Sequence, residues 1–396
     1  MRKKGIKWPT LITDPMMSLV IVGLITLGTI AVTSTTVFIA QRQYHDLFYF
    51  ARNHFIHLVI ACTAFLGARR VPFRRWEKLR GIFLILSVLG LAAVLLPGLG
   101  VEVNGSRRWV KIAGWACQPS EFSKLFFLIY LSGYCAQAKN KSKRRKVIFW
   151  LLPILWLLVC ACLLIVQPDF GSAAVLGLVT LVVLFTAGIP LTSFVIIAIA
   201  VTTLAVACAV LEPYRMLRII SFTDPWKYAY SSGYQLTQAL MAIGRGGVWG
   251  VGLGNSLQKI FYLPEAHTDF IFAVFCEELG LIGGLGLLLA YLFCVLRMVS
   301  WAYFFEQNNH LFSALYTVAL SSWIAVQVGI SVGVNLGVLP TKGISLPFVS
   351  YGGTHLAVSF FAFGIFSRMM QDIKPVRVKR RYSRYGAKAT GIYERF

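Results

Sequence analysis

The sequence is poor in charged residues, and poorest in acidic ones. Charged residues make up only 13% of the 396 positions, with 15 acidic residues against 38 basic ones. A soluble domain carries about a quarter charged residues, so the composition excludes an ordinary water-soluble enzyme. With 57% hydrophobic residues, the chain instead has the composition of a polytopic membrane protein.

Motifs that would indicate other classes of site are missing. The eight cysteines form no C-x-x-C pair, and seven lie in or beside apolar runs, where small-residue packing explains them. The six histidines form no H-E-x-x-H motif, so the sequence predicts no metal site. The glycine-rich stretches 244–247 and 250–256 lack a preceding buried strand or βαβ unit, which argues against a dinucleotide-binding fold. Their glycines instead favour tight turns and close backbone approach, or N–H donors for an anion.

Long hydrophobic runs occupy most of the chain. A membrane-spanning helix needs about 20 apolar residues, and no loop is long enough for a separate soluble domain. The expected fold class is an all-α polytopic membrane protein with about ten transmembrane helices. Their expected ranges are 16–39, 51–68, 81–97, 119–136, 147–166, 171–188, 191–211, 270–298, 311–335 and 351–371.

Basic residues predict how these helices are oriented. Most of them lie in residues 2–7, 69–80 and 139–146 and in the tail after Met370. Under the positive-inside rule these segments are cytoplasmic, as are both termini. We therefore expect a membrane domain over residues 1–372, with its main extracytoplasmic loop at 212–269 between helices 7 and 8, and a basic cytoplasmic tail at 373–396. Contact of the tail with anionic lipids is favoured over nucleic acid.

Asp269 stands where the large loop gives way to the eighth apolar run. A carboxylate that is partly shielded from water has a raised pKa and can act as a general base. An aspartate just before an apolar helix can equally cap the free N–H groups of that helix. Glu277 and Glu278 follow within the helix, where carboxylates face a cavity or pair with a cation. The residues alone leave these alternatives open.

Glu121 and Lys124 are three residues apart, hence on one face of the fourth expected helix. One interpretation is a structural salt bridge. The other places Lys124 with Arg107 and Arg108 in a phosphate-binding patch. Three cations in a short outer loop run against the orientation rule, which favours the phosphate patch.

Four motifs are together similar to those of the SEDS family (shape, elongation, division and sporulation). They are YQLTQALMAIGRGG from Tyr234, GVGLGNSLQK from Gly250, LPEAHTDFIFAVFCEELG from Leu263 and LPTKGISLPFVSYGG from Leu339. NGSRRWV from Asn104 and QPSEFSK from Gln118 resemble the family's first outer loop. The resemblance covers roughly residues 14–371 and is greater to division members than to elongation members. One departure is Thr354-His355, where the family usually has small serines.

The resemblance implies a ten-helix glycosyltransferase that polymerises the peptidoglycan precursor lipid II at the outer face of the cytoplasmic membrane. It identifies Asp269 with the family's essential loop aspartate, here the general base. We expect inversion in a single displacement, with undecaprenyl pyrophosphate leaving towards cations and no second carboxylate required. The predicted substrate-binding residues are Arg107, Arg108, Glu121, Lys124, Gln235, Gln238, Asn255, Lys259, Glu265, His267, Lys342, Ser350 and Tyr351.

The resemblance also implies partners and a location. The expected partners are lipid II, the nascent glycan strand, membrane lipids, a class B penicillin-binding protein and other division proteins at the septum. The sequence requires no cofactor, although a divalent cation such as Mg²⁺ or Mn²⁺ is compatible with the pyrophosphate. Two alternatives stay open: a lipid II flippase, which would spread polar residues along a path through the bilayer, and a non-catalytic scaffold for the penicillin-binding protein.

Overall fold

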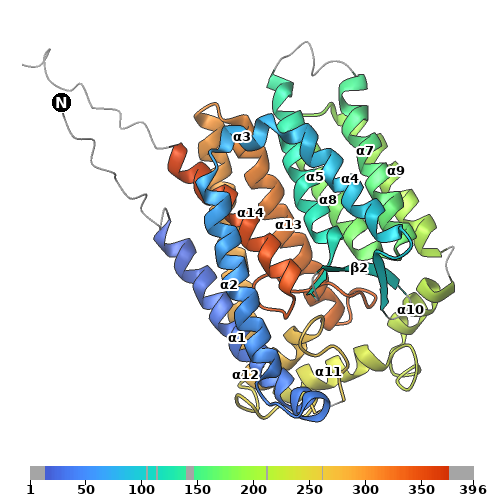
Figure 1. The fold of residues 1–396 in the computed structure, drawn as a ribbon. Helices are drawn as coiled ribbons and strands as arrows, with labels where there is room; N and C mark the ends of the chain where they lie inside the picture. Colours follow the sequence, from blue (N-terminus) through green and yellow to red (C-terminus); the bar gives the residue numbers. More distant parts are fainter. Residues whose placement is uncertain are drawn as a thin grey trace, which may run out of the picture.

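The computed structural model describes residues 14–103, 106–112, 115–139, 147–210, 213–260 and 262–373. Figure 1 shows these residues as a bundle of long helices. Each apolar run expected from the sequence contains a helix. These helices are α1 (Pro15–Tyr44), α2 (Tyr49–Arg70), α4 (Arg80–Leu95), α5 (Pro119–Cys135), α7 (Val147–Val166), α8 (Phe170–Thr186), α9 (Leu191–Val210), α12 (Ile271–Gln307), α13 (Leu311–Asn335) and α14 (Gly353–Asp372). The shorter elements are α3 (Phe73–Lys78), η1 (Ala136–Lys139), α10 (Pro213–Thr223) and α11 (Tyr234–Gly246).

Five helices within the described ranges are long and apolar enough to cross a membrane, namely α1, α2, most of α7, α12 and α13. Three more, α4, α8 and the first part of α9, are apolar but shorter. A mainly helical, multi-pass membrane protein is therefore confirmed, whereas ten crossings and their topology stay predictions. The start of α1 and the end of α14 lie at one end of the bundle (Figure 1). We call the opposite end, which carries α10, α11 and a small sheet, the loop end.

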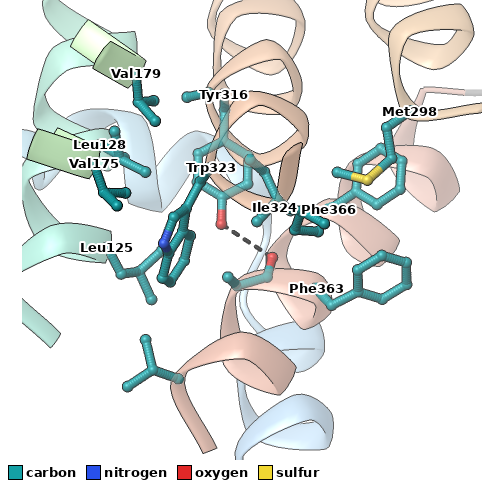
Figure 2. Close-up of a cluster of buried hydrophobic side chains, with 14 of the residues drawn as sticks. Leu125, Leu128, Val175, Val179, Met298, Tyr316, Trp323, Ile324, Phe363 and Phe366 are labelled. Atoms are coloured by element: carbon teal, nitrogen blue, oxygen red, sulfur yellow. Dashed lines mark hydrogen bonds between the residues drawn. The ribbon is translucent and has the colours of Figure 1, made fainter. Parts of the chain in front are cut away.

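The core of the bundle is centred on α13. Trp323 and Tyr316 of this helix are almost completely buried, and α13 packs against α5, α8, α12 and α14 (Figure 2). The Tyr316 hydroxyl donates a hydrogen bond to the carbonyl of Ala362 over 3.0 Å. A core packed this closely resists displacement. It makes α13 a rigid support for its last residue, Asn335, at the loop end.

The expectation of an all-α chain is wrong in one connection. An antiparallel sheet of β1 (Gly100–Val103), β2 (Ser106–Ile112) and β3 (Trp115–Cys117) lies between α4 and α5. Asn104-Gly105, between the sequences of β1 and β2, is a strong hairpin signal that an argument from apolar runs does not use. Successive side chains of a strand point to opposite faces. Arg107 and Arg108 of β2 therefore project to opposite sides of the sheet.

A kink in α12 receives the glycine-rich loop that follows α11. Gly280 has a φ of 68°, which interrupts the helix. A Cβ atom on Gly280 would lie 2.4 Å from the Gly250 nitrogen, so both positions need glycine. The N–H groups of Val251 and Gly252 donate to the carbonyls of Glu277 and Glu278, both over 3.0 Å. These glycines thus serve close backbone packing, and their N–H groups are occupied by protein carbonyls.

Candidate active site

Asp269 lies two residues before α12 and is fixed through its main chain. The buried Asn335 side chain donates to the Asp269 carbonyl over 3.0 Å and accepts from the Ala273 N–H over 3.0 Å. The capping position of α12 is Phe270, and no side chain of that residue or of Asp269 caps the helix. The alternative of Asp269 as the helix cap is therefore wrong, because Asn335 on α13 supplies that acceptor instead.

The carboxylate of Asp269 is unusual in its surroundings. It is partly buried, and neither oxygen has a hydrogen-bond or ion-pair partner within the described residues. Burial first, and then the charge of Glu265, raise the pKa of Asp269 to about 7, while Arg108 and Arg218 act in the opposite direction. A carboxylate with a pKa near 7 exchanges protons readily at neutral pH, as general acid–base chemistry requires.

The charges of Arg108 and Arg218 act on this carboxylate, and Lys342 lies on the segment that touches it; we call Arg108, Arg218 and Lys342 the cationic face. Arg108 donates from Nε to the Gln167 carbonyl over 3.2 Å and also hydrogen-bonds the Pro168 carbonyl. Arg218 donates to the Thr341 carbonyl over 2.8 Å. The Lys342 ammonium lies 4.9 Å from the centroid of the Phe170 ring. These contacts are to carbonyl oxygens and an aromatic ring, and they hold the three side chains in place.

The segment that carries Lys342 touches the carboxylate directly. A Cβ atom on Gly343 would lie 2.8 Å from Asp269 Oδ2, so a larger residue would displace the carboxylate. Two further contacts hold the preceding loop: Ser350 Oγ donates to the Thr268 carbonyl over 2.7 Å, and the Tyr351 N–H donates to the His267 carbonyl over 2.9 Å. The loops before α12 and α14 therefore form one unit around Asp269.

Glu265 adopts a left-handed backbone conformation at the start of this unit, with a φ of 56°. Its carboxylate accepts a hydrogen bond from the Thr268 hydroxyl over 2.7 Å. Such conformations are uncommon for residues other than glycine and concentrate at functional sites. Glu265, His267, Lys342, Ser350 and Tyr351, all predicted as site residues, are therefore brought together with Asp269 and Arg108.

Glu121 and Lys124 are paired inside the bundle, with 2.8 Å between Nζ and Oε1. The other oxygen of Glu121 lies 3.0 Å from His355 Nδ1. The neighbouring Thr354 hydroxyl accepts a hydrogen bond from the Gln118 N–H over 3.2 Å. The Thr354-His355 departure thus joins the start of α14 to the start of α5. A salt bridge is present, as one of the two interpretations predicted.

Other predicted residues lie apart from the cationic face. Lys259 is buried, and its ammonium contacts Ser34, the Gly254 carbonyl and Glu278 at 2.7–2.8 Å. Arg107 forms an exposed ion pair with Glu102 on the neighbouring strand over 3.3 Å. Asn255 closes the glycine-rich loop by donating to the Val251 carbonyl over 3.2 Å, and Gln235 and Gln238 are half-buried on α11.

Three features of the site have no counterpart among the predicted residues. Arg218 belongs to α10, whose sequence PYRMLRIISFT has the mixed character of an interfacial helix rather than of a motif. Asn335 is a polar residue at the end of an apolar run, and this position in the sequence could have marked it as a candidate site residue. Residues 167–170, which anchor Arg108 and Lys342, fall in a short connection between α7 and α8 and carry no distinct signal.

No group of three or more metal-ligating side chains occurs among the residues that the structure describes. Neither of two cavities of about 460 and 470 Å³ in the described part of the chain is lined by Asp269. The long apolar helices and this site are those of a membrane enzyme, with a carboxylate of raised pKa beside a cationic face at one end of the bundle.

The chain belongs to the cell cycle protein family of FtsW, RodA and SpoVE, whose model matches residues 15–374. It is 39% identical to a probable peptidoglycan glycosyltransferase FtsW of Coxiella burnetii, over 94% of this chain and 99% of that protein. It is 42% identical to the Pseudomonas fluorescens protein of the same name, over 88% and 85%. The predicted family and enzyme class, a SEDS peptidoglycan glycosyltransferase most similar to FtsW, are confirmed.

Solved structures show the same fold. A chain from a peptidoglycan synthase complex that coordinates polymerization and crosslinking superposes with a TM-score of 0.73 and 27% identity, over 92% of this chain and 99% of that chain. The rod shape determining protein RodA of Thermus thermophilus superposes with a TM-score of 0.66 and 25% identity, over 91% and 98%.

Proposed function

We propose that this chain polymerises lipid II into glycan strands at the outer face of the cytoplasmic membrane during septal wall synthesis. The observation that carries this proposal is an unpaired carboxylate, Asp269, with a pKa near 7 beside the cationic face. Glycosyl transfer from a lipid pyrophosphate needs a base for a hydroxyl and positive charge for a diphosphate. The site offers both within one unit of the loop end.

The reaction is a single displacement. The 4-hydroxyl of an acceptor GlcNAc attacks C1 of the donor MurNAc while the C1–oxygen bond to the pyrophosphate breaks. Asp269 takes the hydroxyl proton, and undecaprenyl pyrophosphate leaves with the bonding electrons. Attack from the opposite side converts an α-linked donor into a β-linked product. The diphosphate is a good leaving group, so no second carboxylate has to protonate it.

We assign stabilisation of the leaving group to Arg108, Arg218 and Lys342. Fixed cations aimed at developing negative charge act strongly in a site that excludes water. Arginine in particular matches the oxygen geometry of phosphates. The contacts of these residues to carbonyls and a ring help to position them. Phosphate-binding roles for Arg107, Lys124 and Lys259 stay predictions, because each of these cations has a carboxylate partner.

We also propose the finer topology and the partner. The membrane domain would span residues 1–372 with ten crossings, both termini cytoplasmic, and the 212–269 loop outside. The start of α1 and the end of α14 lie at the same end of the bundle, which supports two termini on one side of the membrane (Figure 1). The related chain in a complex that coordinates polymerization and crosslinking supports a crosslinking partner. We take that partner to be a class B penicillin-binding protein at the septum.

The test uses detergent-purified protein with fluorescent lipid II, with and without the partner transpeptidase. Asp269→Asn is expected to lose glycan ladders by about 100-fold or more. Asp224→Asn is the matched control, because Asp224 is an exposed aspartate of the same loop that only accepts the Lys227 N–H. Persisting ladders in folded Asp269→Asn would exclude the base assignment. Absence of ladders from the wild type with its partner would favour the flippase.

A further inference from the structure

Five aromatic rings form a continuous row from the tip of the α1–α2 hairpin to the loop that carries Asp269. We call Tyr44, Tyr49, Phe50, Tyr351 and His267 the ring ledge. The first two rings are stacked, with centroids 3.7 Å apart and planes at 9°. Phe50 packs against Tyr49 at 5.4 Å, against Tyr351 at 5.6 Å and against His267 at 5.7 Å. The ledge therefore ends two residues before Asp269.

The ring ledge is reached from solvent and is bordered by polar groups. Tyr44 is 46% exposed, and the other four rings are half-buried. Burial lowers the pKa of His267, so its ring is neutral at pH 7. The exposed pair of Arg52 and Asp46, 3.3 Å apart, lies on the same hairpin as Tyr49. Apolar ring faces with a few adjacent donors and acceptors are typical of a site for a neutral, hydroxyl-bearing ligand.

Two cavities of the molecule are lined by residues outside the ring ledge. The cavity lined by Tyr303 and Glu306 lies at the far end of α12 from Asp269. The groove between α1 and Leu253 has Glu278 in its lining, which is already paired with Lys259. Tyrosines at a membrane surface can also serve as interfacial anchors. Anchoring explains an exposed Tyr44, but it does not explain a row of rings that continues into the Asp269 loop.

A pyranose ring has one face of apolar C–H bonds and an edge of hydroxyl groups. The C–H face packs on aromatic rings, whereas a phosphate gains nothing there. Arg108 of β2 and Arg218 of α10, whose charges act on Asp269, belong to elements that carry none of the five rings. We propose that the ring ledge is a sugar subsite, which holds the acceptor saccharide by stacking while the cationic face holds the donor pyrophosphate. This assignment rests on the proposed function.

The first experiment compares the double substitution Tyr44→Leu/Tyr49→Leu with Tyr44→Trp/Tyr49→Trp in the complex with the partner. Leucine keeps apolar volume but removes the ring, so we expect the KM for lipid II to rise about tenfold with kcat changed less than about twofold. The tryptophan variant should stay within about twofold of the wild-type KM. Tyr230→Leu, at a fully exposed tyrosine of the large loop, is the matched control.

A second experiment separates this inference from the proposed function. Saturation-transfer NMR of a GlcNAc tetramer with Asp269→Asn protein should show contact with the sugar ring protons, and Tyr44→Leu/Tyr49→Leu should remove the signal. An unchanged KM and unchanged transfer in the folded leucine variant would overturn the ledge while leaving the polymerase intact. If the wild type makes no polymer at all, the proposed function fails. The saturation-transfer signal of the GlcNAc tetramer then decides by itself whether the ring ledge binds a saccharide.

Discussion

The shielded carboxylates of the protein differ in their partners: some have a cation, Asp169 accepts the Ser172 N–H at the start of α8, and Asp269 has neither kind of partner among the described residues. Glu121, Glu277 and Glu278 are buried, and each has a cation at 2.8 Å, namely Lys124, Arg245 and Lys259. Asp269 has arginines nearby but no ion pair among the described residues. The paired glutamates link one element to another through their cations, whereas burial without such a partner raises the pKa of Asp269 to about 7. The comparison separates structural acids from the acid available for chemistry.

Breaking a structural pair should have the largest effect on stability. Glu278→Ala leaves Lys259 buried and unpaired, which costs about 3–5 kcal/mol. Thermal unfolding in detergent, followed by circular dichroism, should show a midpoint lowered by several degrees. The double variant Lys259→Met/Glu278→Leu should recover most of the loss, because it removes both charges. A double variant as unstable as the single one would show that the pair is not the cause.

Neutralising Asp269 should have the opposite effect on stability. Its raised folded-state pKa means that folding favours the protonated acid, so this stability is present below about pH 4 and is lost as the pH rises through about 7. Asp269→Asn should therefore unfold at a higher temperature than the wild type at pH 8, with a smaller difference at pH 5. If Asp269→Asn and the wild type had the same unfolding midpoint at pH 5 and at pH 8, Asp269 would not be an unpaired, shielded carboxylate.

The support from α13 can be tested at Asn335. Asn335→Ala removes the hydrogen bonds to the Asp269 carbonyl and the Ala273 N–H. We expect a loss of about 1–3 kcal/mol, because two buried groups lose their partners. The kcat should fall more than the KM rises, since the base is displaced while the substrate surfaces remain. Asn308→Ala is a control, since Asn308 only donates to the Phe304 carbonyl at the far end of α12. Equal effects of the two substitutions would exclude a special role for Asn335.

The neighbours of Asp269 should move its pKa in opposite directions. Polymerisation should fall as the pH drops below about 7, because the base becomes protonated. Removing a positive neighbour with Arg218→Ala should shift this acidic limb to higher pH. Removing a negative neighbour with Glu265→Gln should shift it to lower pH. A rate profile measured from pH 5 to 9 gives both shifts, and shifts of the same sign would rule out the proposed electrostatics.

The smallest effect is expected on the exposed side of the sheet. Arg107→Ala breaks a solvent-exposed ion pair with Glu102, worth at most about 1 kcal/mol. Arg108→Ala, on the opposite face of the same strand, removes a residue of the cationic face and should lower kcat more. Measuring kcat for both variants at low and at high salt compares the two losses. A larger loss from Arg107→Ala would reverse the assignment of the two faces.

Local sequence was sufficient for much of the fold and for singling out Asp269 as the candidate base. Runs of apolar residues about 20 long are compatible with little besides helix in lipid, so the helix positions followed from composition. The motif around Asp269 was specific enough to indicate its chemistry. The sequence also contains Asn104-Gly105, which is typical of a β-hairpin. A search for long apolar runs finds membrane helices and does not detect such short strands.

Only the tertiary structure decided which charges belong together. Arg107 and Arg108 are adjacent in sequence yet face opposite sides of a strand, and Lys124 and Lys259 are both buried beside glutamates. Arg218, far from any motif, is brought to Asp269 by the packing of α10 against the loop before α14. A charge acts over a few ångströms of space rather than of sequence. The sequence by itself therefore determined the helices, the family and Asp269 as the candidate base, and the packing of its loops decided the surroundings of that carboxylate.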